Sequence, residues 1–236
     1  MKSFISALVF VLVLANVGHA TTLSGKVAFK GTAPSAKPIK MNADPKCAEA
    51  NKDKKPVSED VVVNSNGTLQ NVFVYVKEGL TQKDFQASTE PMVVFDQNGC
   101  RYHPHVFGIR TNQTLEIRNS DPTLHNVHAL PKTNSQFNVG MPIKDMKISK
   151  KFEKPEIGAK IKCDVHPWMK AYVHIMDHPF YSVTGEQGSF EIKDLPAGKY
   201  VVSAWHETYG TKDVSVTVEE GKPTSVSFDF SSTDKK

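Results

Sequence analysis

The sequence has little helical periodicity, few cysteines and no long apolar run after its N-terminus. Three cysteines occur among 236 residues, and no stretch beyond residues 4–17 is long and apolar enough to suggest a bilayer span. The lysine-rich stretches 52–55 and 144–154 lack interleaved aromatic residues, so we expect solvated loops there and no nucleic-acid partner. The sequence also lacks a catalytic Ser-His-Asp order, a phosphate loop and a distinctive carboxylate pair, which argues against an enzyme.

The N-terminus has the pattern of a secretory signal. Lys2 precedes the apolar stretch 4–17, and Gly18-His19-Ala20 ends on small residues. Residues 1–20 are therefore predicted to be a cleaved signal peptide, the alternative being an uncleaved N-terminal anchor. No cysteine lies near the cleavage point, so a lipoprotein anchor is not expected. The mature protein is predicted to be periplasmic or secreted, with no membrane span after signal cleavage.

Short runs rich in Val, Ile, Phe, Tyr and Thr fill the rest of the chain, punctuated by Gly, Pro, Asn and Asp. This pattern is typical of antiparallel sandwiches or barrels, so the predicted fold class is all-β. The runs are GKVAF, NVFVYVKE, MVVF, HVFGI, TLEIR, HNVHAL, AKIKC, AYVHIM, SFEI, KYVVSAW, DVSVTVE and TSVSFDF. Two weak helical candidates remain, at residues 44–52 and 80–86.

The last third of the chain carries a turn, then SFEI, then LPAGKY and another strand-like run. This order resembles the carboxypeptidase regulatory-like, transthyretin-like β-sandwich, a resemblance that speaks to fold and says little about function. Two runs near the N-terminus, at 23–31 and 71–79, resemble the opening strand and a later strand of that sandwich. We therefore expect one sandwich split into residues 21–84 and 178–236, with a second domain at 85–177 inserted between the halves. Two sequential domains are the simpler alternative.

The odd number of cysteines leaves one unpaired if the others form a disulfide in an oxidising compartment. Cys47 and Cys100 both lie in turn-like contexts, whereas Cys163 ends a strand-like run beside other soft ligands. The economical pairing is a Cys47–Cys100 disulfide, with Cys163 kept as a thiolate. The sequence alone does not prove this connectivity.

The middle unit carries two motifs with metal-ligand character. The stretch CDVHPWM places Cys163, His166 and Met169 in one predicted hairpin loop, and His125 leads a strand upstream in NSDPTLHNVH. A type 1 copper site requires two imidazoles and one thiolate near a plane, plus a weak axial thioether. One histidine from a distant strand and three ligands from one loop supply this set. These four residues are therefore the predicted ligands of one type 1 copper ion.

The loop C-x-x-H-P-x-M resembles the short ligand loop of amicyanin in the cupredoxin (blue copper) family. HNVH and the preceding NSD resemble the segment around that family's first histidine ligand, and the likeness covers roughly residues 92–177. It implies a Greek-key sandwich and one-electron transfer, and it implies that Asn126 ties the two ligand segments together by hydrogen bonds. It further implies electron exit through an exposed edge of His166, beside Pro167 and Trp168. A c-type cytochrome or a periplasmic dehydrogenase is the implied redox partner.

The loop departs from the amicyanin pattern at Val165, where that family has proline. Val165 offers a backbone N–H, and if this group points at the Cys163 sulfur it should stabilise the thiolate and favour reduced copper. We therefore expect a higher reduction potential than the same loop would give with proline.

Structural roles are alternatives for each predicted ligand. Cys163 could be a buried free thiol, His166 and Met169 could fill the loop and core, and His128 competes with His125. A further metal site at His103 and His105, which are spaced two apart, lacks additional ligands. A copper-carrier protein and a structural or adhesion module with a stabilising metal are alternative functions, and a zinc hydrolase is the weakest because Met is a poor zinc ligand.

Overall fold

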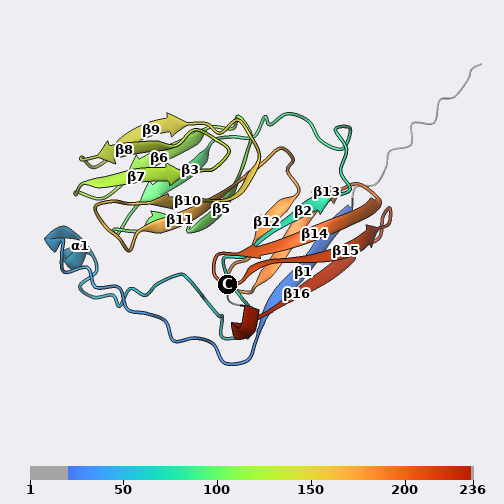
Figure 1. Cartoon of the computed structure of the whole chain (residues 1–236), viewed down its shortest axis with the longest axis horizontal. Helices are drawn as coiled ribbons and strands as arrows, with labels where there is room; N and C mark the ends of the chain where they lie inside the picture. Colours follow the sequence, from blue (N-terminus) through green and yellow to red (C-terminus); the bar gives the residue numbers. More distant parts are fainter. Residues whose placement is uncertain (1–20, 235–236) are drawn as a thin grey trace, which may run out of the picture.

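The computed structural model describes residues 21–234, and the predicted signal peptide lies outside them. The regular secondary structure of the described chain is almost entirely β-strand, as expected, and it forms two sandwiches (Figure 1). Each sandwich encloses its own cluster of buried apolar side chains. Within residues 21–234, no helix has the length and apolarity that a membrane crossing requires.

The first sandwich combines strands from both ends of the described chain. One sheet has the order β13 (Ser189–Leu195), β1 (Thr21–Lys30) and β16 (Thr224–Ser231). The other has the order β12 (Tyr181–Val183), β2 (Phe73–Glu78), β14 (Gly198–His206) and β15 (Gly210–Val218). β1 runs antiparallel to β13 and parallel to β16, and β2 lies between β12 and β14. The segments before residue 79 therefore share their sheets with the segments after residue 180.

The second sandwich is built from the middle of the chain. Its larger sheet has the order β5 (Val106–Arg110), β11 (Lys170–Met176), β10 (Glu156–Lys162), β7 (His125–Leu130) and β8 (Phe137–Met141). Its smaller sheet has the order β4 (Tyr102–His103), β3 (Val93–Gln97), β6 (Leu115–Asn119) and β9 (Met146–Lys150). Alternating burial along β6 follows the period-two pattern of LEIRN, in which Leu115, Ile117 and Asn119 face the interior.

The two sandwiches meet at a small aromatic contact. The ring of Phe73 from β2 stacks on the ring of His174 from β11, with centroids 3.9 Å apart. Trp205 from β14 meets the same imidazole edge-on at 4.6 Å. Met176 is buried beside Phe73 in this contact. Strands of both sandwiches therefore contribute to one apolar interface.

Residues 31–72 leave the first sandwich after β1 and return at β2, and between these points they run to the second sandwich (Figure 1). This segment carries the helix of the described chain, α1 (Pro45–Ala50). The carboxylate of Asp44 accepts hydrogen bonds from the backbone N–H groups of Lys46 and Cys47, which is N-terminal capping. The weak helical prediction at 44–52 thus corresponds to a real but shorter helix.

Two sequence predictions of local structure are wrong. Residues 80–86 form a turn, because Thr81 and Asp84 bond each other through side chain and backbone and the hydrogen-bonding pattern does not continue. The lysine-rich stretch 144–154 is not all loop, since it contains β9, in which Lys147 is exposed while Ile148 packs on the core and Lys150 lies over the Phe137 ring. The weak alternation of this stretch did not indicate a strand; the strand forms because it pairs with β6.

Candidate metal centre

Three of the predicted ligands meet at one end of the second sandwich. His125 opens β7, while Cys163 and His166 lie in the loop between β10 and β11. Nδ1 of His125 is 2.9 Å from Nδ1 of His166, which is 3.8 Å from Sγ of Cys163. All three side chains are buried, and their ligand atoms lie within 4.8 Å of one another. The structure thus brings together side chains that are far apart in the sequence.

The loop holds its shape through its own backbone. The N–H of Cys163 donates to the carbonyl of Met169 at 3.1 Å, and the N–H of Met169 donates to the carbonyl of His166 at 2.9 Å. The N–H of His166 points back at Sγ of Cys163, 3.3 Å away. Since Lys162 and Lys170 are paired across β10 and β11, the loop closes directly above the sheet. Met169 is buried at its base.

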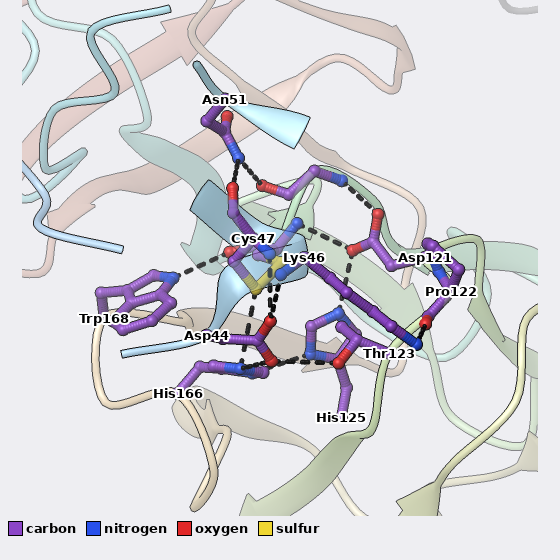
Figure 2. The surroundings of a disulfide bond; sticks show 12 residues. Asp44, Lys46, Cys47, Asn51, Asp121, Pro122, Thr123, His125, His166 and Trp168 are labelled. Carbon is purple, nitrogen blue, oxygen red and sulfur yellow. Dashed lines mark hydrogen bonds and ion pairs between the residues drawn. A yellow bond between two sulfur atoms is a disulfide. The ribbon is translucent and has the colours of Figure 1, made fainter. Parts of the chain in front are cut away.

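A carboxylate lies behind each imidazole (Figure 2). Oδ2 of Asp121 is 2.9 Å from Nε2 of His125, and Oδ2 of Asp44 is 3.1 Å from Nε2 of His166. A carboxylate accepts hydrogen bonds, so each Nε2 carries a proton and donates it. Each Nδ1 then turns a lone pair towards the other ring.

Two lone pairs 2.9 Å apart repel unless a cation lies between them, either a shared proton or a metal ion. Burial disfavours charge on His125, but its hydrogen bonds to Asp121 and Cys163 prevail and raise its pKa to about 9. Burial dominates at His166 and lowers its pKa. In the metal-free protein a proton between the two Nδ1 atoms removes this repulsion. A metal ion bound by both nitrogens and the sulfur would replace that proton, so the donor set fits a soft transition metal.

The surroundings of the Cys163 thiol favour its thiolate form. Burial raises its pKa, but hydrogen bonds from His125 and from the backbone N–H groups of Asn126, His166 and Val165 outweigh burial and lower the pKa overall. The Val165 N–H therefore acts on the sulfur in the sense expected from the sequence. The His166 N–H shares this role at 3.3 Å, which the sequence interpretation did not include.

Asn126 lies where the two ligand segments meet. Its Oδ1 accepts the backbone N–H of Asp164 at 2.6 Å and lies 3.2 Å from Sγ of Cys163. Its Nδ2 donates to Asn138 and to the Asp164 carboxylate. These bonds join β7 to the ligand loop, which is the link that the resemblance implied.

The expected exposed edge of His166 is absent. Only 2% of His166 is exposed, because Asp44 and the Cys47 sulfur cover its Nε2 edge, the sulfur at 3.6 Å. Of the predicted exit patch, Pro167 is exposed and Trp168 is half-buried. The Trp168 ring lies 5.0 Å from the His166 ring, and its Nε1 donates to the Cys100 carbonyl at 3.0 Å.

The remaining histidines do not join this centre. His128 lies within β7, paired with Lys162 of β10 and Asn138 of β8, and its Nδ1 is 2.9 Å from the Asp164 carboxylate. His103 contacts the Asn98 carbonyl at 3.2 Å, whereas His105 contacts Glu207 of the other sandwich and the Lys170 carbonyl. Among residues 21–234, no group of potential metal ligands contains any of these three histidines.

The predicted disulfide is confirmed. Cys47 of α1 is bonded to Cys100, with Cα atoms 5.6 Å apart, and Cys163 is free and buried. Asp121 accepts the backbone N–H of Cys100 at 2.7 Å and also holds His125. The disulfide thus lies directly behind the two imidazoles (Figure 2).

Asp44 and Asp121 are the site residues that sequence reasoning missed. Asp121 precedes His125 by four residues, and its place in the NSDPTLH segment was a usable signal that it lies near this histidine. Asp44 had a weaker one, because the Asp-Pro step marks a helix start just before Cys47, yet nothing in the sequence indicated proximity to His166.

Comparison with known proteins gives two kinds of similarity. Residues 167–231 match the carboxypeptidase regulatory-like domain family, a range that also takes in β11 of the second sandwich. A purple cupredoxin from Nitrosopumilus maritimus is 19% identical and has a TM-score of 0.30, with 35% of this chain and 97% of that chain covered. An oxidized amicyanin mutant is 18% identical and has a TM-score of 0.33, with 42% of this chain and 99% of that chain covered.

A copper-containing nitrite reductase from Thermus scotoductus is 17% identical with a TM-score of 0.31, covering 42% of this chain and 25% of that one. No curated protein matches the chain. Over parts of its length the chain thus resembles the cupredoxins and the carboxypeptidase regulatory-like domain.

Proposed function

We propose that this protein is an exported type 1 copper protein that carries single electrons between redox partners. The observation that carries this proposal is the convergence of two imidazole Nδ1 atoms and one thiol sulfur within 4.8 Å, all buried. His125, His166 and Cys163 would hold the ion, with the thioether of Met169 as the weak axial ligand. Bound copper would supply a one-electron couple between Cu(I) and Cu(II).

The chain's own residues perform the positioning. Asp121 and Asp44 accept from Nε2 of each imidazole, so that both Nδ1 atoms face inward, where a metal ion would replace the proton that lies between them. Backbone N–H groups stabilise the Cys163 thiolate, and Asn126 fixes the loop against β7. Because these contacts are present without the ion, little reorganisation is needed when charge changes, which is what electron transfer requires.

The donor set favours copper over zinc. Structural zinc sites use four Cys or His ligands, and catalytic zinc sites keep an open position for water. Here the ligands would be one thiolate and two imidazoles, with the buried Met169 in the same loop as Cys163 and His166. A buried site of this kind supports a carrier without catalytic activity of its own.

A docking surface for a partner is supported by apolar side chains beside the ligand segments. Leu124 and Val165, each 45% exposed, directly precede His125 and His166. Ile143 is 65% exposed. The side-chain amide of Asn119 donates to the carbonyls of both Ile143 and Met141. Exposed apolar patches mark interaction sites. A c-type cytochrome or a periplasmic dehydrogenase is the proposed partner.

The test is to load the purified metal-free protein with Cu(II). Thiolate-to-copper charge transfer should make it intensely coloured, and Cys163→Ser should abolish the colour. His128→Gln, at a histidine outside the centre, is the matched control and should remain coloured. Colourless wild-type protein would refute the proposal.

A copper-carrier function is the second candidate, and the covered Nε2 edge of His166 is the observation that favours it. Such a protein would exchange copper with a partner and show no fast electron exchange. Reversible voltammetry of the loaded protein separates the two, because a carrier of copper alone needs no reversible couple.

A further inference from the structure

A covalently anchored segment covers the metal centre. This segment, residues 44–51, is called the cap; it comprises Asp44, α1 and Asn51. The Cys47–Cys100 disulfide fixes it to the second sandwich, and Nδ2 of Asn51 donates to the Gly99 carbonyl at 3.1 Å. Lys46 also reaches the Pro122 carbonyl. The cap is therefore held on both sides of the helix rather than resting loosely on the surface (Figure 2).

Asp44 is the residue through which the cap touches the centre. Its Oδ1 accepts the backbone N–H groups of Lys46 at 2.8 Å and Cys47 at 3.1 Å. Its Oδ2 accepts the hydroxyl of Thr123 at 3.0 Å and lies 3.1 Å from Nε2 of His166. All of these partners are donors, so both oxygens of Asp44 act as acceptors, as those of a carboxylate do. A fixed, ionised carboxylate thus faces the outer nitrogen of one imidazole.

This contact has two effects on His166. The carboxylate selects the tautomer with a proton on Nε2, which leaves the Nδ1 lone pair directed at His125, 2.9 Å away. The negative charge also makes the ring a stronger donor, as carboxylate partners do for metal-bound histidines. Asp121 acts on His125 in the same way, so both imidazoles are supported by carboxylates.

We propose that Asp44, carried by the disulfide-anchored cap, is a positioning residue that biases the centre towards oxidised copper. The added negative charge stabilises the dication more than the monocation, because the interaction scales with the charge of the ion. The copper-dependent part of this inference rests on the proposed function, whereas the tautomer of His166 belongs to the metal-free protein and can be measured independently.

The test compares Asp44→Asn with two controls. Asn retains helix capping but replaces one acceptor oxygen with a donor. Glu49→Gln removes the same charge from an exposed position of the same helix, and Thr123→Val removes the other partner of Oδ2. Asp44→Ser, which also caps helices, is a second variant in case Asn perturbs folding.

Nitrogen chemical shifts of the metal-free wild type should show His166 protonated on Nε2, and Asp44→Asn should lower that tautomer's population. In loaded protein, the preference for Cu(II) over Cu(I) should fall roughly tenfold, the lower end of effects seen for such outer partners. For one electron this raises the potential by about 59 mV. Glu49→Gln should change neither reading.

Three results would overturn the proposal: an unchanged tautomer in Asp44→Asn, an unchanged potential, or an equal change in Glu49→Gln. Failure of the wild type to bind copper would overturn the proposed function and the claim about oxidised copper together. In that case the nitrogen shifts still decide whether Asp44 sets the His166 tautomer.

Discussion

His174 should make the contact between the two sandwiches sensitive to acid. The side chain is completely buried, stacks on Phe73 with an interplanar angle of 7°, and accepts the Gly158 N–H through Nδ1 at 3.2 Å. Burial lowers its pKa to about 3, because a charged imidazole would lose its water in this apolar contact. Unfolding returns the pKa to its ordinary value of 6.5.

The sign follows from proton uptake. Below pH 6.5 the unfolded chain binds a proton at His174 while the folded chain does not, so stability falls as pH decreases and the loss is complete near pH 3. Between pH 7 and pH 5 this residue should reduce the free energy of unfolding by about 2 kcal/mol, out of a limit of roughly 5 kcal/mol. Above pH 7 it should have no effect.

The assay is urea unfolding of metal-free protein at pH 7 and pH 5, for the wild type and His174→Phe. Phenylalanine keeps the ring stack on Phe73 and removes the titrating group, although it loses the Gly158 hydrogen bond at both pH values. The variant should therefore lose about 2 kcal/mol less than the wild type between the two pH values. Equal losses in the two proteins would refute the assignment of this acid sensitivity to His174.

Val165→Pro should lower the reduction potential of the copper-loaded protein by roughly 40 mV, because a hydrogen bond to the Cys163 thiolate contributes about 1 kcal/mol to the reduced state. An unchanged or raised potential by voltammetry would contradict this role. Gly25→Ala should destabilise the first sandwich by about 1–3 kcal/mol in urea unfolding. Its Cβ would lie 1.7 Å from the Val226 carbonyl oxygen; Ser24→Ala, at the neighbouring position, should unfold like the wild type.

The strands could be predicted from the sequence because the side chains of a half-buried strand alternate between buried and exposed faces with period two. Runs such as LEIR and KYVVSAW are apolar or alternating, and both are strands in the structure. β8 and β9 were missed because Asn138 and Gly140 interrupt the apolar pattern of β8, and because β9 lies within a lysine-rich stretch. Their strand state comes from pairing with β7 and β6, a tertiary effect that local propensity does not encode.

The candidate ligands could be recognised in the sequence for a different reason. Cys163, His166 and Met169 are close in sequence, and their spacing suits one loop, so their proximity is nearly a local property. His125 required a long-range assumption, and the pairing of β7 with β10 brings it to the loop. The burial of His166 could not be predicted from the sequence, since it depends on a helix that starts far upstream.

The cap connects the first sandwich to the candidate metal centre in the second. Residues 31–72 connect β1 to β2, which are both strands of the first sandwich, yet the middle of this connection is bonded to the second sandwich at Cys100. Strands hold both ends of this connection, and a disulfide, which removes conformational freedom from the unfolded chain, holds its middle. The first sandwich therefore anchors the segment that places Asp44 against His166. A fragment of residues 85–177 would keep the four predicted ligands and lose this carboxylate, so the two sandwiches are linked through the candidate metal centre as well as through their shared interface.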